Sequence, residues 1–324
     1  MATTSTVVGG YELWARIGVG ATGTVWKAHR RGPVPHVVAM KRLRATVTTP
    51  AELARIQHEA AVLTELDHPH IVRLIDVLED GDALAIAMQL AAGGSLEALL
   101  AERGQLRPGE VVAVAAPIAD ALWSAHRRGI IHGDVKAANI LFTSDGAPLL
   151  ADFDVARSLG RMTRDQVAGT AEYVAPELLR GALPDQRSDI YSLGVVCHEA
   201  LFGYIPCTGA VPEPSVRSVE TDRPLADTIE RAMARDPNDR FPSADAFARA
   251  LRDSVAHEVI GLPRVPATAV APDDEPARST RTFGPQPPRP ETRPRWWWRV
   301  PGVRLVARVV RAGLRRQPGR LPHQ

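Results

Sequence analysis

One short stretch of the sequence concentrates side chains that could carry out chemistry: IIHGDVKAANILF, residues 130–142. Apolar residues open and close it, and between them lie His132, Asp134, Lys136 and Asn139. Four polar groups inside an apolar run are not ordinary core, because buried polar groups are costly without partners. A carboxylate can accept a proton, an ammonium can neutralise negative charge, and an amide oxygen can ligate a metal. The stretch, called the catalytic strip below, is therefore a candidate reaction centre.

A glycine-rich stretch near the N-terminus is a candidate phosphate-binding loop. IGVGATGTVWKA holds Gly18, Gly20 and Gly23 in a G-x-G-x-x-G pattern. In dinucleotide-binding folds such a loop leads from a strand into a helix, but the alternation in residues 24–30 predicts a second strand. We therefore expect a β-hairpin, in which glycines let backbone N–H groups approach phosphates without side-chain clash. A glycine-rich hairpin that binds no ligand is the alternative for this motif by itself.

A lysine and a glutamate could form a charged pair beside that loop. Lys41 ends the apolar segment VVAMK, and Glu59 lies between Leu63 and Leu66 on the apolar face of a helix predicted over residues 49–66. Two costly charges become tolerable if they meet. A Lys41–Glu59 pair would hold the ammonium toward the α- and β-phosphates of a nucleotide. A solvated charge at a strand edge is the alternative for Lys41 taken alone.

Lysine is rare in this sequence, which makes each lysine informative. The chain contains 36 arginines and three lysines, which are Lys27, Lys41 and Lys136. Lysine carries a compact ammonium on a flexible stem and arginine a broad planar fork, so some sites do not accept the exchange. Lys41 and Lys136 belong to the candidate motifs, whereas no role is predicted for Lys27.

Charge and cysteine content exclude several classes of protein. Residues 257–324 hold 13 Lys and Arg against 5 Asp and Glu, and residues 1–256 hold 26 against 32, so the whole chain carries only +2. A generic nucleic-acid binder is therefore not expected, and no specific nucleic acid is predicted as a partner. Cys197 and Cys207 show no CxxC spacing, which argues against a disulfide framework or a zinc site and favours a reducing compartment.

Hydrophobic periodicity predicts a β-rich first part and a helical second part. Alternation predicts strands within residues 11–48 and two more over residues 71–79 and 83–90. After the glycine turn at residues 93–95 the pattern becomes helical. The main predicted helices cover residues 111–129, 189–203, 228–236 and 243–255.

The motifs and their order resemble one known family. The glycine-rich loop, Lys41, HGDVKAAN, ADFD at residues 151–154 and GTAEYVAPE at residues 169–177 are similar to the signature set of eukaryotic-type (Hanks-type) bacterial serine/threonine protein kinases. The resemblance covers about residues 11–253. It implies an α+β, bilobal protein kinase-like fold, with a small β-rich N-lobe that carries one main helix and a larger α-helical C-lobe.

The resemblance assigns catalytic roles to four residues. Asp134 would accept or orient the proton of a substrate hydroxyl, and Lys136 would neutralise charge on the transferring γ-phosphoryl group. Lys41 and Glu59 would complete the set. Lysine at position 136 is typical of serine/threonine kinases rather than tyrosine kinases.

The resemblance also implies ATP and a divalent cation as cofactors. Asn139 and Asp152 are the expected ligands of Mg²⁺, with Mn²⁺ as an alternative ion. Val25, Ala39 and Leu141 would sandwich the adenine. The full set of expected ATP-binding residues is Ile17, Gly18, Val19, Gly20, Ala21, Thr22, Gly23, Thr24, Val25, Ala39, Lys41, Met88, Leu90 and Leu141.

Other positions are expected to support the site without reacting. Glu177 should form a buried ion pair with Arg240, and Asp189 should brace the catalytic strip. His132 should support the strip rather than titrate. Thr170 stands where these kinases hold the activation segment onto the catalytic aspartate and lysine.

Two positions depart from the family pattern. Gly133 replaces the usual arginine of H-R-D, which makes the chain a non-RD type, and Asp154 replaces the glycine of D-F-G. Without that arginine, phosphate on Ser158 or Thr163 would lose its usual cationic partner, so activity should not depend on loop phosphorylation through this contact. Aspartate is one of the few residues that tolerates the dihedrals of glycine, and here it adds negative charge near the metal ligands.

The predicted function is ATP-dependent transfer of the γ-phosphoryl group to protein serine and threonine hydroxyls, with autophosphorylation at Ser158 or Thr163. A pseudokinase scaffold that binds nucleotide or partners without transfer is one alternative, and a small-molecule phosphotransferase is another. The complete polar set argues against the first and the GTAEYVAPE segment against the second. The predicted parts are an N-terminal extension (1–10), a kinase domain (11–255, with N-lobe 11–92 and C-lobe 93–255), a Pro/Arg-rich disordered linker (256–295) and a basic tail (296–324).

The tail is a candidate membrane-surface segment. Trp296, Trp297 and Trp298 precede a stretch to about residue 316 in which arginines fall on one side of a helical wheel and aliphatic residues on the other. Such a helix suits an anionic membrane surface. A solvated tail, or docking to a partner, to nucleic acid or to the kinase domain, is the alternative. With neither a signal peptide nor an apolar run of about 18 residues, we expect a cytoplasmic protein, peripheral at the inner membrane face if the tail binds lipid.

Overall fold

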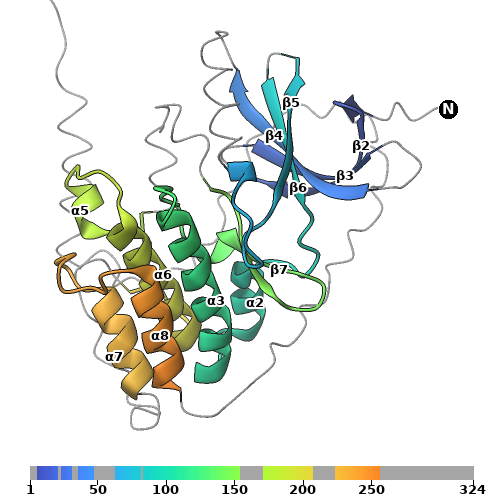
Figure 1. The fold of residues 1–324 in the computed structure, drawn as a ribbon. Coiled ribbons are helices and arrows are strands. Elements are labelled where there is room, and N and C mark those ends of the chain that lie inside the picture. Colours follow the sequence, from blue (N-terminus) through green and yellow to red (C-terminus); the bar gives the residue numbers. More distant parts are fainter. Residues whose placement is uncertain are drawn as a thin grey trace, which may run out of the picture. The chain divides into compact units, whose positions relative to one another are not determined.

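The computed structural model describes residues 6–20, 23–30, 36–46, 63–81, 83–153, 171–206 and 223–255 of the chain. Within these ranges a six-stranded sheet comes first and a mainly helical region follows (Figure 1). The chain divides into residues 1–273 and 274–324, and every described residue belongs to the first unit.

The sheet is antiparallel throughout and runs in the order β1-β2-β3-β4-β6-β5. Along β4, Val38 and Met40 are fully buried in the core of the sheet, together with Tyr11 of β2. Successive side chains of a strand point to opposite faces, so Ala39 and Lys41 face the other side. The strands are β1 (Val7–Val8), β2 (Tyr11–Val19), β3 (Gly23–Arg30), β4 (His36–Thr46), β5 (Leu74–Asp80) and β6 (Ala83–Gln89).

The predicted strands are confirmed, with one shifted boundary. The strand expected from Ile71 begins at Leu74, because the residues before it bond elsewhere. Ile71 forms a parallel bridge with Leu150, and the N–H of Val72 donates to the carbonyl oxygen of Leu150 at 2.9 Å. These bonds join the chain that enters the sheet to the segment that follows the catalytic strip.

The helical region buries two long helices at its centre. α3 and α6 supply much of the main core, and α3 packs against both α6 and α8. The helices are α2 (Leu96–Arg103), α3 (Pro108–His126), α5 (Pro176–Leu179), α6 (Gln186–Phe202), α7 (Arg223–Ala232) and α8 (Ala244–Ser254). A short 3₁₀ turn, η1 (Ala137–Asn139), and the hairpin of β7 (Ile140–Phe142) and β8 (Pro148–Leu150) carry the strip.

Three helices begin earlier than the apolar pattern predicts. α3 has Pro108 in its first turn, and the Glu110 carboxylate accepts from the backbone N–H of Arg107 at 2.9 Å and from its guanidinium at 3.2 Å. α6 begins after Asp185, whose side chain accepts from the N–H groups of Arg187 and Ser188. Periodicity detects the buried stripe of a helix but not its polar first turn, where capping decides the boundary. Most of the helix predicted over residues 49–66 lies outside the described residues; Leu63, at its end, packs against the main core.

Glycine at position 23 is required by the pairing of β3 with β4. A Cβ atom on Gly23 would lie 2.2 Å from the backbone oxygen of Arg42. The neighbouring Gly20 differs, since the nearest atom to a Cβ there is the carbonyl oxygen of Gly23 at 4.0 Å. One glycine of the loop is therefore explained by strand packing rather than by ligand approach.

We predict that Gly23→Ala lowers the free energy of unfolding by about 1–3 kcal/mol, because the β4 backbone must move to admit the methyl group. Gly20→Ala is the matched control and should change stability by less than about 0.5 kcal/mol. Urea unfolding of the two variants measures the difference. Equal midpoints for both would contradict the close approach of β3 to β4.

Candidate active site

The catalytic strip gathers its polar groups around one carboxylate. The Oδ2 atom of Asp134 accepts hydrogen bonds from Lys136 Nζ at 2.7 Å and from Asn139 Nδ2 at 3.0 Å. The same amide nitrogen of Asn139 also donates to the backbone oxygen of Asp134, at 2.8 Å. Residues two and five positions apart thus meet because the backbone turns through η1.

A buried aspartate of α6 holds the backbone of the strip. Asp189 is 1% exposed, and its two oxygens accept from the N–H groups of His132 at 2.9 Å and Gly133 at 2.8 Å. His126 Nε2, at the end of α3, lies 2.8 Å from the Oδ2 atom of the same carboxylate. The bracing role predicted for Asp189 is confirmed, and the contact with His126 was not foreseen.

Gly133 occupies a backbone conformation that favours glycine. Its φ is 75°, in the left-handed region. The residue therefore combines a positive φ with an N–H bond to Asp189, directly before Asp134. A side chain is absent at the position where the related kinases usually carry arginine.

The ring of His132 connects the strip to the segment after β8. It is buried, its Nε2 lies 3.0 Å from the backbone oxygen of Ala151, and its Nδ1 accepts from the N–H of Asp134 at 3.2 Å. Since Nδ1 accepts a hydrogen bond, the neutral ring carries its proton on Nε2 and donates it to Ala151. The ring also lies 4.6 Å from that of Phe153, between centroids. These contacts agree with the supporting role expected for His132.

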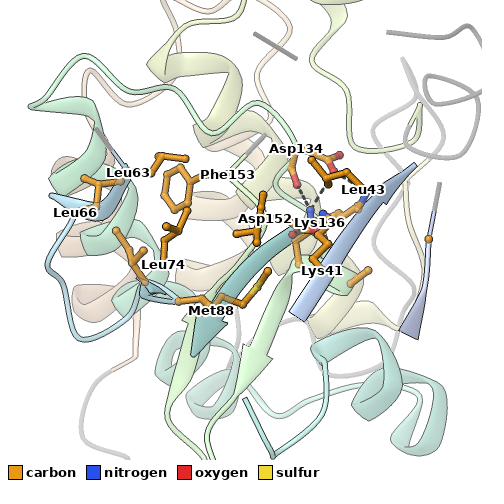
Figure 2. A pocket seen from close by; sticks show the side chains of 16 residues that line it. Lys41, Leu43, Leu63, Leu66, Leu74, Met88, Asp134, Lys136, Asp152 and Phe153 are labelled. Carbon is orange, nitrogen blue, oxygen red and sulfur yellow. Dashed lines mark hydrogen bonds and ion pairs between the residues drawn. The ribbon is translucent and has the colours of Figure 1, made fainter. Parts of the chain in front are cut away.

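An ion pair connects the sheet to the helical region. Lys41 Nζ lies 2.7 Å from Asp152 Oδ1, and Figure 2 shows the two side chains meeting beside Lys136 and Asp134. Asp152 has φ 59°, the one positive value for a non-glycine residue in the described ranges. Such strain is concentrated at functional sites, where surrounding contacts maintain it. The predicted partner of Lys41, Glu59, lies outside the described residues.

Two neighbouring cavities meet at these charges. One, of about 310 Å³, has Lys41, Asp134, Lys136 and Asp152 at one end, while its other end is apolar (Figure 2). The other, of about 620 Å³, shares Lys41 and Asp152 with the first. The expected ATP-binding residues that line the larger cavity are Ile17, Gly18, Val19, Gly20, Val25, Ala39, Lys41, Met88, Leu90 and Leu141.

Some expected nucleotide contacts do not line this cavity. Gly23 and Thr24 are described but do not form part of its wall, and residues 21–22 lie outside the described ranges. Conversely, sequence analysis did not predict Lys27 or Glu97, and both line the larger cavity. The rarity of lysine was the only signal for Lys27.

The donor set fits a hard divalent cation. Within the described part of the chain, the hydrogen bonds of the Asn139 side chain use its nitrogen, which leaves its Oδ1 as a metal ligand. Asp152 supplies a second carboxylate oxygen beyond the one that faces Lys41. Two protein oxygens, with phosphate and water oxygens completing the shell, are the usual ligands of Mg²⁺ in nucleotide sites.

The ion pair predicted between Glu177 and Arg240 is confirmed. Arg240 is fully buried and donates to both carboxylate oxygens, at 2.7 and 2.8 Å, and its guanidinium also lies over the ring of Tyr191. Burial would raise the pKa of Glu177, but the hydrogen bonds from Arg240 outweigh it and hold this pKa below its usual value. The pair anchors α5 to the segment before α8.

A second buried contact, between Tyr173 and Glu199, was not predicted. The hydroxyl of Tyr173 donates to Glu199 Oε2 at 2.6 Å. Burial raises the pKa of Tyr173, and the hydrogen bond to Glu199 raises it further. The pKa of Glu199 is also raised, first by burial. The contact fixes the segment around Tyr173 against α6, close to the strip.

The sequence pattern described as "Protein kinase domain" matches residues 11–255. This chain belongs to the protein kinase family. Its fold is that of the bilobal kinases, and its relatives place it among the bacterial Hanks-type serine/threonine kinases.

The similarity to named kinases extends over most of the chain. It is 37% identical over 279 residues to the serine/threonine-protein kinase PkaA of Streptomyces coelicolor, covering 78% of this chain and 51% of that one. It is 35% identical over 276 residues to PknL of Mycobacterium bovis, covering 79% and 68%. This chain thus spans about half the length of PkaA.

A solved kinase domain has the same architecture. The crystal structure of the Mycobacterium tuberculosis PknI kinase domain matches with a TM-score of 0.64 and 32% identity, covering 79% of this chain and all of that one. In the described part of the present kinase, no helix is long and apolar enough to cross a bilayer.

Proposed function

We propose that this chain is an ATP-dependent serine/threonine protein kinase of the non-RD type. The observation that carries the proposal is the convergence of Lys136 and Asn139 on Asp134, next to the Lys41–Asp152 pair, at the junction of two cavities. Named serine/threonine kinases among its relatives support the same activity.

The proposed chemistry needs few groups. A serine or threonine oxygen attacks the γ-phosphorus of ATP, the bond to the β-phosphate oxygen breaks, and the hydroxyl proton leaves. Asp134 orients that hydroxyl and accepts its proton, while Lys136, 2.7 Å away, offsets the negative charge of the transferring group. Lys41 orients the α- and β-phosphates of the nucleotide.

Asn139 and Asp152 are the proposed ligands of Mg²⁺ or Mn²⁺. The cation supplies charge neutralisation between the β- and γ-phosphates. The larger cavity, with Val25, Ala39 and Leu141 in its wall, is the proposed adenine site.

We predict that Asp134→Asn lowers kcat by about 10²–10⁴-fold, since the amide cannot accept the hydroxyl proton. The measurement is label transfer from γ-labelled ATP with Mg²⁺ to a generic protein substrate. Asp253→Asn, on the exposed end of α8, is the matched control and should keep wild-type activity.

The same assay separates the rival functions. Binding of ATP by the wild type without transfer above the Asp134→Asn level would favour a pseudokinase scaffold. Transfer to small molecules but to no protein would favour a small-molecule phosphotransferase.

The non-RD assignment leads to a proposal about regulation. Gly133 offers no cation to a phosphorylated activation segment, and its N–H is bound to Asp189. Phosphate on Ser158 or Thr163 therefore has no partner at this position. We propose that the strip is held in its active conformation by Asp189 rather than by a loop phosphate.

We predict that phosphatase treatment leaves kcat within about threefold of its starting value, because the strip has no arginine before Asp134 whose contact with a phosphate could be lost. The double variant Ser158→Ala/Thr163→Ala should likewise keep kcat within about threefold of the wild-type value. Mass spectrometry verifies that phosphate has been removed. Loss of activity on dephosphorylation, restored by autophosphorylation, would contradict the proposal.

The proposed domain plan places a linker at residues 256–295 and a membrane-surface helix within residues 296–316. The support is in the sequence alone: three consecutive tryptophans followed by arginines and aliphatic residues on opposite sides of a helix. These residues lie outside the described ranges.

We predict that the full-length chain floats with vesicles of anionic phospholipid and that a truncated chain of residues 1–256 does not. Neutral phosphatidylcholine vesicles should recover less protein, since about 1 kcal/mol per basic residue comes from the anionic surface. Equal recovery of the two chains with anionic vesicles would remove the membrane proposal.

A further inference from the structure

All three lysines of this chain line the two neighbouring cavities. Lys27 and Lys41 line the larger cavity, and Lys41 and Lys136 line the smaller one. None of the 36 arginines of the sequence is among the described residues that line either cavity. A chain that uses arginine nearly everywhere thus keeps an ammonium at three cleft positions, and only two of them have a role in the proposed reaction.

Lys27 lies at the nucleoside end of the larger cavity. Its neighbours across the sheet are Ala15 on β2 and Ala39 on β4, whereas Lys41 pairs with Val25 one step closer to the strip. Two residues along a strand correspond to about 7 Å. Lys27 is therefore displaced along the strand from Lys41 toward the proposed adenine site, and its cross-strand neighbours are both alanines.

Glu97 lies on the opposite wall of the same cavity. It belongs to the first turn of α2, after the N-cap Ser95, and its side chain is exposed. Ile17 and Ala92, which also line this cavity, are exposed as well, so this is its open side. A carboxylate in the first turn of a helix also interacts favourably with the helix dipole, but that effect does not require the opposing lysine.

Neither charge has an ion-pair partner within the part of the chain that the structure describes. Lys27 is half-buried, so its ammonium is less screened than a fully exposed one. Opposite charges that face one open pocket from two walls can meet when a ligand brings those walls together.

We propose that Lys27 and Glu97 pair across the mouth of the larger cavity when a nucleotide is bound, and so retain its nucleoside end. The inference rests on the proposed nucleotide-binding function and adds two positioning residues to it. Neither residue touches the transferring phosphoryl group, so their contribution belongs to nucleotide affinity and not to the chemical step.

Lysine suits position 27 because the mouth of the larger cavity must open. An arginine at position 27 could hold Glu97 through two parallel hydrogen bonds, a stronger pair that would close the mouth in the nucleotide-free protein as well. A single flexible ammonium releases the carboxylate more readily. Lys27→Arg should therefore slow nucleotide association.

Calorimetric titration of the full chain with ADP and with adenosine tests the pair. Lys27→Met and Glu97→Gln should each raise Kd about three- to tenfold for both ligands. The Kd of the double variant should be no higher than that of the more impaired single variant. The kcat of each variant at saturating ATP should stay within about twofold of the wild-type value. The charge-reversed Lys27→Glu/Glu97→Lys should recover at least half of the loss. Arg16→Gln, an exposed position on β2 outside the cavity wall, is the control.

The outcomes separate this inference from the proposed function. Unchanged Kd values in both single variants, with a wild type that binds ADP, would overturn the pair and leave the kinase proposal intact. Losses that add up in the double variant would also overturn it, because independent residues do not form a pair. A wild type that binds neither ligand would overturn both proposals. In stopped-flow mixing, an association rate of Lys27→Arg equal to that of the wild type would refute the explanation for lysine.

Discussion

The carboxylate of Asp189 is the contact on which the site depends. It lies inside α6, away from water, and its oxygens accept two consecutive backbone N–H groups of the strip and approach His126 of α3. Each buried donor left without an acceptor costs about 1–3 kcal/mol, so these hydrogen bonds favour a single backbone conformation of the strip. This conformation places Asp134, and the side chains of Lys136 and Asn139 donate hydrogen bonds to its carboxylate.

Further polar and charged side chains connect the strip to the rest of the site. His132 connects the strip to the backbone of Ala151, and the next residue, Asp152, meets Lys41 of the sheet. Buried ion pairs contribute little net stability, because desolvation offsets most of their attraction, but breaking one leaves a costly unpaired charge. The buried Glu177–Arg240 pair is therefore better understood as fixing geometry than as holding the fold together. The Lys41–Asp152 pair, in which the aspartate side chain is 38% exposed, also contributes little stability, because exposed ion pairs are screened by solvent.

The sequence predicted the parts of this site whose signal is local. HGDVKAAN identified the strip because residue types and spacing are both constrained by the chemistry. Glu177–Arg240 and the brace from Asp189 were expected from family resemblance, and the structure contains both. The start of β5 was misplaced, because the backbone bond from Val72 to Leu150 joins residues far apart in the chain. The contacts of His126 and Tyr173 were missed for the same reason, since each partner lies on α6.

Gly23 and Lys27 illustrate opposite errors of interpretation. Gly23 was assigned to phosphate binding from its motif, yet the closeness of the Arg42 backbone already requires glycine there. Lys27 matched no motif, yet it lines the larger cavity. A pattern along the chain reports which residues are unusual, but the cross-strand register decides what each one faces.

We infer that Asp189 positions Asp134 through the backbone of the strip. Asp189→Asn tests it most directly, because the amide keeps the shape but presents an N–H₂ group to one of the two backbone donors. With folding verified by thermal unfolding, we predict a fall in kcat of about 10²-fold, which is the cost of a small misplacement at the reacting centre, and a nearly unchanged Kd for ADP. A folded variant that keeps wild-type kcat would contradict it.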